Sequence, residues 1–251
     1  MSILRASSGV GLRGAVRLWS RRYDVDPWGL LGAGSNTATT YGLSALAQWW
    51  MGTPNVAGSP GVVLPPGYVA LGTGDVVDDP PNPSDQCLYA EGYGTRIAVS
   101  FDDLVTTTTA LLAATYSTVQ AVGTWTEVGL FDSDVTVTAV GSSGASLGSS
   151  VLPLAAGAPA VLGGATPGQY TTANIEDGLS SEYIALLNPA AYGAGSWTLR
   201  APLAFSHAAG IPITVFSGNL WAHAAITPSV TNPGGMQLLA QWLSPFSAVG
   251  A

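Results

Sequence analysis

Trp125-Thr-Glu-Val-Gly-Leu-Phe131 is the stretch of sequence that best indicates how this chain folds. In an extended chain Trp125, Glu127 and Phe131 lie on one face, whereas Val128 and Leu130 lie on the other. Alternation of this kind is typical of a β-strand with two different faces. We therefore predict a strand here, and we examine the sequence on either side for strands that could pair with it.

The surrounding sequence is mostly of the same kind. Further strands are predicted at Tyr68–Leu71, Arg96–Leu104, Thr106–Gln120, Val135–Val140, Tyr183–Asn188, Ser196–Phe205 and Ile211–Ile226. Two segments have helical spacing, namely 37–51, capped by Asn36, Thr37 or Thr39, and a shorter one at 236–243. Residues 10–22 fit a helix or a strand equally well, and the Gly-rich stretch 24–36 is predicted to be a loop.

These elements predict a mainly β fold, an antiparallel β-sandwich with one or two short helices. We divide the chain into a basic N-terminal arm and loop (1–36) and a sandwich domain (37–251) with an inserted Gly/Ser/Ala-rich region at about 133–196. Within that region, residues 141–168 carry no charge. We expect them to form short strands or a loop that a partner covers.

The composition is unusual in its shortage of charge. Only 9% of the 251 residues are charged, and lysine is absent, whereas 47% are hydrophobic. Typical soluble domains have about 25% charged residues. Because so few charges solvate a bare surface poorly, we expect neighbouring subunits to cover much of it. No apolar run is long enough for a membrane span, and the single cysteine, Cys87, cannot form an intrachain disulfide.

The few cationic residues are concentrated at one end. Five of the seven arginines lie in the first 22 residues, which contain no acid: Arg5, Arg13, Arg17, Arg21 and Arg22. All fifteen acids face only Arg96 and Arg200 in the remainder, which gives that part a net charge of −13. We predict that the arginine-rich segment docks on an acidic neighbour, such as a second copy of the chain. A solvated face and, less favoured, a helical stripe that binds nucleic acid are the alternatives.

Residues that could perform catalysis are scarce. No G-x-S-x-G motif occurs, and Cys87 has no histidine near it in sequence. The acids Asp75, Asp78, Asp79 and Asp85 lie in one proline-rich loop without EF-hand spacing, so a solvated acidic loop is preferred to an irregular calcium site. We interpret Cys87 as a buried small side chain and His223, in an apolar strand, as a core or interface histidine. The sequence predicts no enzyme activity, no cofactor and no metal site.

Three segments resemble a known family in their content and order. They are Tyr41-Gly-Leu-Ser-Ala-Leu-Ala47, Tyr68-Val-Ala-Leu-Gly-Thr-Gly74 and Trp125-Thr-Glu-Val-Gly-Leu-Phe-Asp132. This order is similar to that of tail-associated structural proteins of double-stranded DNA bacteriophages, of the baseplate, tail-fibre and neck type. Glu91 and Arg96 match the acid and arginine of the family's middle part, and 199–205 resembles its following strand. The match covers 37–132 and 197–226; residues 133–196 are an insertion, and 1–36 have no counterpart.

The matched residues also suggest a physical reason for their presence. Gly72 and Gly74 would permit positive φ in a tight turn. Arg96 and Glu127 have opposite charge on predicted strands, so we expect them to pair across the sheet. Trp125 and Phe131 would then cover that pair, and the pair would specify the strand register.

The resemblance implies a non-enzymatic structural protein that is located in the virion. It would assemble with copies of itself and with other virion proteins, as a tail, baseplate or fibre-attachment subunit. The chain's eight Trp and nine Tyr leave another class open, a receptor- or glycan-binding module on the virion surface that contacts a host glycan. A hydrolase of cell-wall or capsular sugar is a third hypothesis, disfavoured because no carboxylate pair is suitably placed. We expect neither a membrane nor nucleic acid as partner.

Overall fold

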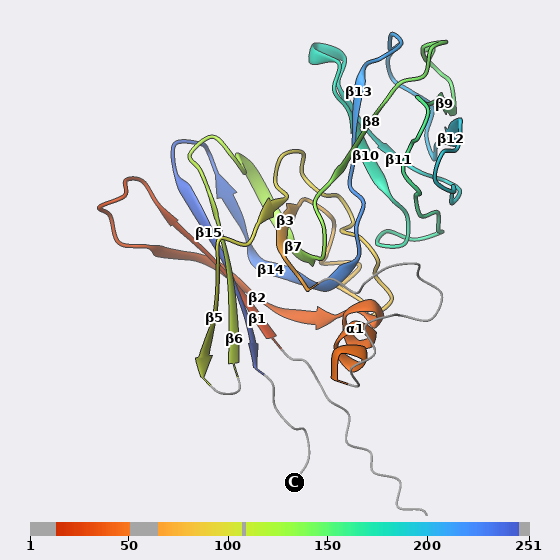
Figure 1. The fold of residues 1–251 in the computed structure, drawn as a ribbon. Helices are drawn as coiled ribbons and strands as arrows, with labels where there is room; N and C mark the ends of the chain where they lie inside the picture. Colours follow the sequence, from red (N-terminus) through yellow and green to blue (C-terminus); the bar gives the residue numbers. More distant parts are fainter. Residues whose placement is uncertain (1–13, 51–64, 107–108, 246–251) are drawn as a thin grey trace, which may run out of the picture.

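The computed structural model describes residues 14–50, 65–106 and 109–245. Its main body is a nine-stranded sheet in the order β4-β3-β7-β14-β2-β1-β15-β6-β5, in which every neighbouring pair is antiparallel (Figure 1). The strands are β1 Gly14–Arg21, β2 Gly29–Ala38, β3 Tyr68–Gly72, β4 Ile97–Ala98, β5 Phe101–Thr106, β6 Thr109–Tyr116, β7 Gly123–Phe131, β14 Leu220–Asn232 and β15 Gln237–Pro245. The mainly β, antiparallel fold class is thus confirmed.

The sheet curls around one large core. The pairing of β14 with β7 shifts register between Ala225 and Val230, and such a bulge bends the sheet. Buried side chains from both halves of the sheet then meet inside it. They include Val16, Leu18, Val69, Leu71, Tyr116, Val128, Leu130, Trp221, Ile226, Leu238 and Trp242.

Residues 14–21 form a strand, which decides between the two alternatives left open by the sequence. Val16 and Leu18 are fully buried and Arg17 between them is exposed, as a two-residue period requires. The expected arm and loop at 1–36 is therefore wrong from residue 14 onward, because β1 and β2 are inner strands of the main sheet. The helical stripe of arginines is also wrong, because β1 is extended.

Two further expectations are corrected. The predicted loop at 24–36 contains β2, whose glycines let β14 approach: a Cβ on Gly32 would lie 2.7 Å from Cγ2 of Val230. The predicted helix at 236–243 is β15, which pairs with β1 and β6. Its buried residues Leu238, Ala240 and Trp242 alternate with less buried ones, as in a strand. The sequence also fits a helix, because apolar residues at most of its positions satisfy both the helical and the strand period.

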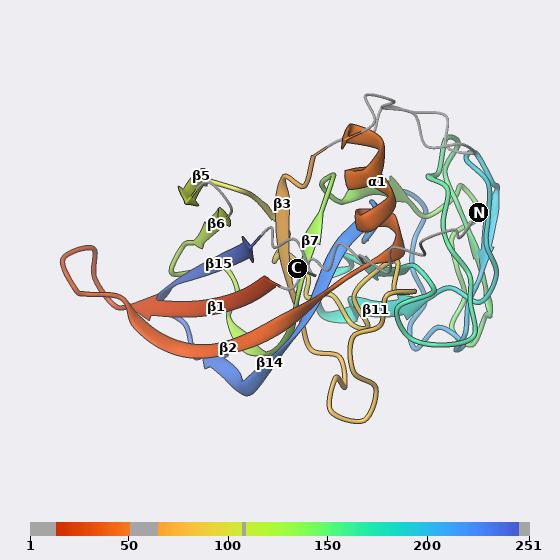
Figure 2. The same ribbon diagram turned by 90° about the horizontal axis from the view of Figure 1, so that it is seen from below.

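The predicted helix at 37–51 is confirmed as α1, Thr40–Trp50, which lies beside β14 (Figure 2). Thr39 is its cap, since Oγ1 of Thr39 accepts a hydrogen bond from the backbone N–H of Gly42 at 3.1 Å. Gly42 is required at this position because a Cβ would overlap the backbone carbonyl of Trp221. Among the described residues, no helix is long and apolar enough to cross a membrane.

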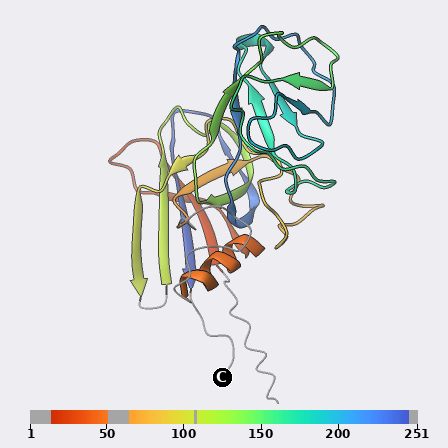
Figure 3. The ribbon, with the colours of Figure 1, turned by 45° about the vertical axis from the view of Figure 1, so that its right-hand side comes forward.

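A second β unit is inserted between β7 and β14 and stands beyond one end of the main sheet (Figure 3). Its four-stranded sheet has the order β11-β10-β13-β8, and β12 pairs with β9. The elements are β8 Thr136–Ala139, β9 Val151–Pro153, β10 Thr172–Ile175, the 3-10 turn η1 Gly178–Ser180, β11 Glu182–Ala185, β12 Ser196–Thr198 and β13 Pro212–Val215.

This inserted unit has its own hydrophobic core and extends further than predicted. Leu152, Ile175, Leu186, Trp197 and Ile213 are among its fully buried side chains. The expected end of the insertion, at about 196, falls inside the unit, because β12 and β13 belong to it. The segment 199–205, expected to be a strand of the main domain, also lies here and is irregular except for one bridge from Leu199 to Leu186.

Candidate functional site: the junction between the two β units

Glu127, in the centre of β7, accepts four hydrogen bonds near the junction. One carboxylate oxygen accepts the backbone N–H of Gly74 at 2.9 Å and of Ala90 at 2.8 Å, and the other accepts that of Tyr89 at 3.1 Å. Burial alone would raise the pKa of Glu127, but hydrogen bonds, above all from His223, hold it below its ordinary value. The side chain is therefore a buried carboxylate anion.

Gly72 and Gly74 make room for this carboxylate. Neither residue has the positive φ that we expected. A Cβ on Gly74 would lie 2.6 Å from Oε1 of Glu127, and one on Gly72 would overlap the same oxygen. These glycines are needed because the Glu127 side chain lies against the backbone of β3 and of the turn after it.

His223, in β14, joins Glu127 to the proline-rich loop. Its Nε2 lies 2.8 Å from Oε2 of Glu127, and its Nδ1 lies 2.8 Å from Oδ2 of Asp85. A neutral imidazole has one N–H, so only the protonated ring can donate to both carboxylates. Burial alone would lower the pKa of His223, but the bonds to Asp85 and Glu127 raise it. The core histidine is confirmed, whereas Asp85, expected in a solvated loop, is buried.

Arg96 pairs with Glu91 rather than with Glu127, so the expected cross-strand pair is wrong. Nε of Arg96 donates to Oε1 of Glu91 at 2.9 Å and Nη2 donates to Oε2 at 2.5 Å, with both side chains 1% exposed. Burial raises the pKa of Glu91, and the Arg96 charge opposes that rise. Glu127 is not available, because its oxygens are taken by His223 and three backbone N–H groups.

The two aromatic residues of β7 also lie apart. Phe131 lies under Arg96, with the guanidinium carbon 3.7 Å from the ring centroid, and packs with Ala70, Leu88 and Leu220. Trp125 belongs to the large core and donates its indole N–H to the carbonyl of Ala121. The prediction that both rings cover one ion pair is thus wrong, although Phe131 does cover Arg96.

Arg96 also binds both segments that connect the two units. Its Nη1 donates to the backbone carbonyls of Ser133, where the chain leaves the main sheet, and of Ser217, where the chain returns. Nearby, Oγ1 of Thr136 and Oγ of Ser217 are 2.6 Å apart. One guanidinium therefore links the main sheet, the outgoing segment and the returning segment.

Asp132, the first residue after β7, also holds the two connecting segments together. Its carboxylate accepts the hydroxyl of Tyr41 at 3.0 Å, the hydroxyl of Ser133 at 3.0 Å, and both the backbone N–H and the side-chain amide of Asn219, at 2.9 and 2.7 Å. Burial and the Asp132 charge raise the pKa of Tyr41 to about 12. The first residues after β7 and before β14 are thus held together and against α1.

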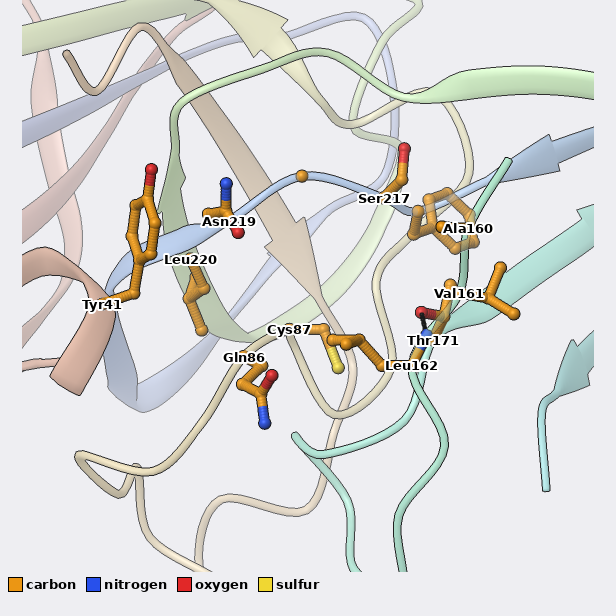
Figure 4. Close-up of a pocket in the computed structure, with 12 residues that line it drawn as sticks. Tyr41, Gln86, Cys87, Ala160, Val161, Leu162, Thr171, Ser217, Asn219 and Leu220 are labelled. Atoms are coloured by element: carbon orange, nitrogen blue, oxygen red, sulfur yellow. Dashed lines mark hydrogen bonds between the residues drawn. The ribbon is translucent and has the colours of Figure 1, made fainter. Parts of the chain in front are cut away.

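A pocket of about 300 Å³ opens between the two units beside this junction (Figure 4). The main body contributes residues from α1, from the loop before Leu88 and from the start of β14, and the inserted unit contributes the wall opposite. The lining residues are Tyr41, Gln86, Cys87, Ala160, Val161, Leu162, Thr171, Phe216, Ser217, Gly218, Asn219 and Leu220. None of these lining side chains is a carboxylate, a guanidinium or an imidazole. Cys87 is buried, as expected.

The arginines expected to dock on a neighbour are not equivalent. Arg17 and Arg22 are exposed, whereas Arg21 is bonded within the chain, to Oε1 of Gln237 at 2.7 Å and to Oδ1 of Asp24 at 2.9 Å. Arg5 and Arg13 lie outside the described residues. The docking prediction therefore rests, within the described part of the chain, on Arg17 and Arg22.

The second histidine repeats the arrangement of the first inside the inserted unit. Nδ1 of His207 lies 2.9 Å from Asp177 and Nε2 lies 2.7 Å from Glu182, and the imidazole is fully buried. Within the described ranges, no group of three or more His, Cys, Asp or Glu side chains is placed to hold a metal ion. Neither His–carboxylate arrangement leaves a local sequence signal, because the histidine and its carboxylates are 25 to 138 residues apart.

Comparisons with known proteins give no family for the chain. No protein-family model matches it, and searches of curated proteins and of solved structures find no match either.

Proposed function

We propose that the chain is a non-enzymatic structural subunit of a tailed-bacteriophage virion, a self-assembling tail, baseplate or fibre-attachment protein. The observation that carries this proposal is the junction, where Arg96 and Asp132 fix the inserted unit to the end of the main sheet. A unit held at a defined position on a rigid sheet is suited to present a surface to a neighbouring subunit. The resemblance in sequence order to tail-associated proteins supports the same class.

The state of the buried ionisable groups supports a structural role. Glu127, His223, Glu91 and Arg96 are at most 7% exposed, and their polar atoms bond to one another, to Asp85 or to the backbone. A general acid or base must reach its substrate within hydrogen-bond distance. Because these groups are enclosed and already bonded, they stabilise the fold and offer no proton to a bound molecule.

The surface of the inserted unit supports self-assembly. Residues 135–217 contain four formally charged residues, and each is bonded inside the chain: Glu176 to Thr214, Asp177 and Glu182 to His207, and Arg200 to the carbonyls of Gly164 and Ala165. Large apolar and aromatic side chains are meanwhile exposed, namely Val137, Leu147, Val151, Leu179, Tyr183, Leu187, Tyr192 and Phe205. Aromatic residues without free charge are typical of protein interfaces.

The molar mass of the protein in solution tests the proposal. At about 100 μM, well above the dissociation constants of specific assemblies, light scattering on the protein eluted from a size-exclusion column should give the mass of an oligomer. The variant Leu179→Asp with Tyr192→Asp should dissociate it and leave the far-ultraviolet circular dichroism spectrum unchanged, because both side chains are exposed and the fold of each subunit does not depend on them. The matched control Val25→Asp, on an exposed residue of the main body, should assemble normally. A monomer at this concentration, with no ordered assemblies in electron micrographs, would contradict the proposal.

A further inference from the structure

We propose that the pocket between the two β units binds one neutral, hydroxyl-rich ring of the size of a hexopyranose. This inference is independent of the virion role. The pocket of about 300 Å³ is at the small end of the range for ligand sites. At roughly 30 Å³ for each water, it holds about ten waters, which is the space of a single sugar ring with its hydroxyl groups.

Neutral hydrogen-bonding groups line this pocket from both units. Oγ1 of Thr171 accepts the backbone N–H of Leu162 at 2.8 Å, so its hydroxyl proton is left to donate. The exposed carboxamide of Gln86 makes no hydrogen bond within the described part of the chain, and it supplies both a donor and an acceptor. Asn219 uses its amide N–H on Asp132, which leaves its carbonyl oxygen as an acceptor. Hydroxyl groups, which donate and accept, match this mixture of groups.

The charged groups near the pocket already have their hydrogen-bond partners. Four hydrogen bonds reach the carboxylate of Asp132 from Tyr41, Ser133 and Asn219, and the guanidinium of Arg96 is shared by Glu91 and two carbonyls. An anionic or cationic ligand would lose hydration here without a direct hydrogen bond to an opposite charge, because the oxygens of Asp132 and the N–H groups of Arg96 are already taken. The lining therefore favours an uncharged ligand.

The remaining lining accounts for a ring rather than an open polar chain. Val161 and Leu162 from the inserted unit lie opposite Leu220 from β14, as Figure 4 shows. Apolar surface of this kind packs against the C–H groups of a sugar ring, while the hydroxyl groups at its edge reach Gln86 and Thr171. A wholly apolar ligand would leave those two side chains without partners.

The test is a titration of the ¹⁵N-labelled full chain with methyl glycosides of glucose, galactose and N-acetylglucosamine, followed by NMR. We expect at least one to shift the amide signals of Gln86, Thr171 and Leu220, with a dissociation constant of about 1–10 mM. Methyl glucuronide and glucosamine should bind at least about tenfold more weakly. Maltotriose distinguishes the sources: binding tighter than that of methyl glucoside indicates the end of a glycan, and equal binding indicates a free sugar.

Variants of the same chain complete the test. Leu162→Trp fills the pocket and should weaken binding at least about tenfold, whereas the matched control Leu147→Trp, on an exposed side chain elsewhere in the inserted unit, should bind normally. Gln86→Ala, at an exposed position, should weaken binding about threefold to tenfold without unfolding risk. The proposal is overturned if no neutral glycoside shifts these signals at about 50 mM, if the charged sugars bind equally well, or if Gln86→Ala and Leu162→Trp both bind as the unaltered chain does.

Discussion

Replacing Glu127 by alanine removes the anion that receives three backbone N–H groups and the His223 imidazolium. Nothing else in the described surroundings accepts those four donors, and Glu127 is fully buried. Removing one partner of a buried ion pair costs about 3–5 kcal/mol, because the other charge is left without compensation. We therefore expect the free energy of unfolding to fall by about 4 kcal/mol.

The measurement is urea denaturation followed by tryptophan fluorescence, with calorimetry beside it. For a chain of this size, about 1 kcal/mol lowers the midpoint temperature by roughly 2–4 °C, so the midpoint should fall by about 8–16 °C. Glu127→Gln should cost nearly as much, because its amide would place a second donor against Tyr89 and His223 or against Gly74 and Ala90.

Asp79→Ala is the matched control, since it removes the same charge from an exposed side chain, and it should change the free energy of unfolding by less than about 0.5 kcal/mol. A loss below about 1 kcal/mol for Glu127→Ala would refute the reasoning, because it would mean that the four donors find other acceptors or water.

Three further predictions concern the same region. His223, which lies between Asp85 and Glu127, has a raised pKa, and its ring is edge-on to that of Tyr89. Its contribution to the free energy of unfolding is therefore complete below pH 6.5 and declines as the pH rises through the raised pKa. The free energy of unfolding measured from pH 5.5 to 9 should show this decline, and His223→Gln should lack it. Arg96→Ala should speed proteolysis near residues 133 and 217 and enlarge the radius of gyration in X-ray scattering, whereas Arg17→Ala should change neither. Gly74→Ala should cost about 2 kcal/mol or more by displacing Glu127, while Gly195→Ala, where a Cβ meets nothing within 4 Å, should be neutral; equal melting temperatures would contradict this.

The strands with clear alternation could be predicted from the sequence, and those rich in glycine could not. The strand at 125–131 and the helix capped by Thr39 depend on local patterns, so they were found. Strand β2 was missed because its glycines are required by the close approach of β14, a contact that only the tertiary fold produces. Strand β15 was misassigned because apolar residues at most of its positions fit both periods.

The junction was only partly predictable for a related reason. Of the residues that the sequence indicates as structural, Gly72, Gly74, Arg96, Glu127 and Phe131 lie there, whereas Trp125 belongs to the large core. Their partners were assigned wrongly, since charge and strand position cannot tell whether Glu91, His223 or Glu127 lies nearest to a given arginine. The pocket could not be predicted, because its two walls come from units that are joined by contacts between residues far apart in the sequence, such as Arg96 with the carbonyl of Ser217 and Cys87 with that of Gly168.

The connection between the two units has a consequence for how such a chain can change over time. The chain enters the inserted unit through β8 and leaves it through β13, and these two strands are hydrogen-bonded neighbours, so the covalent connection to the main sheet is two strands wide. The length of the inserted unit beyond β8 and β13 therefore does not alter the spacing of β7 and β14, the strands between which it is inserted. An inserted unit can therefore be exchanged for another of different length or surface, provided that Asp132, Asn219 and Arg96 still hold the connecting segments and that the new unit supplies the carbonyls of Gly168 and Tyr170 that Gln86 and Cys87 bind.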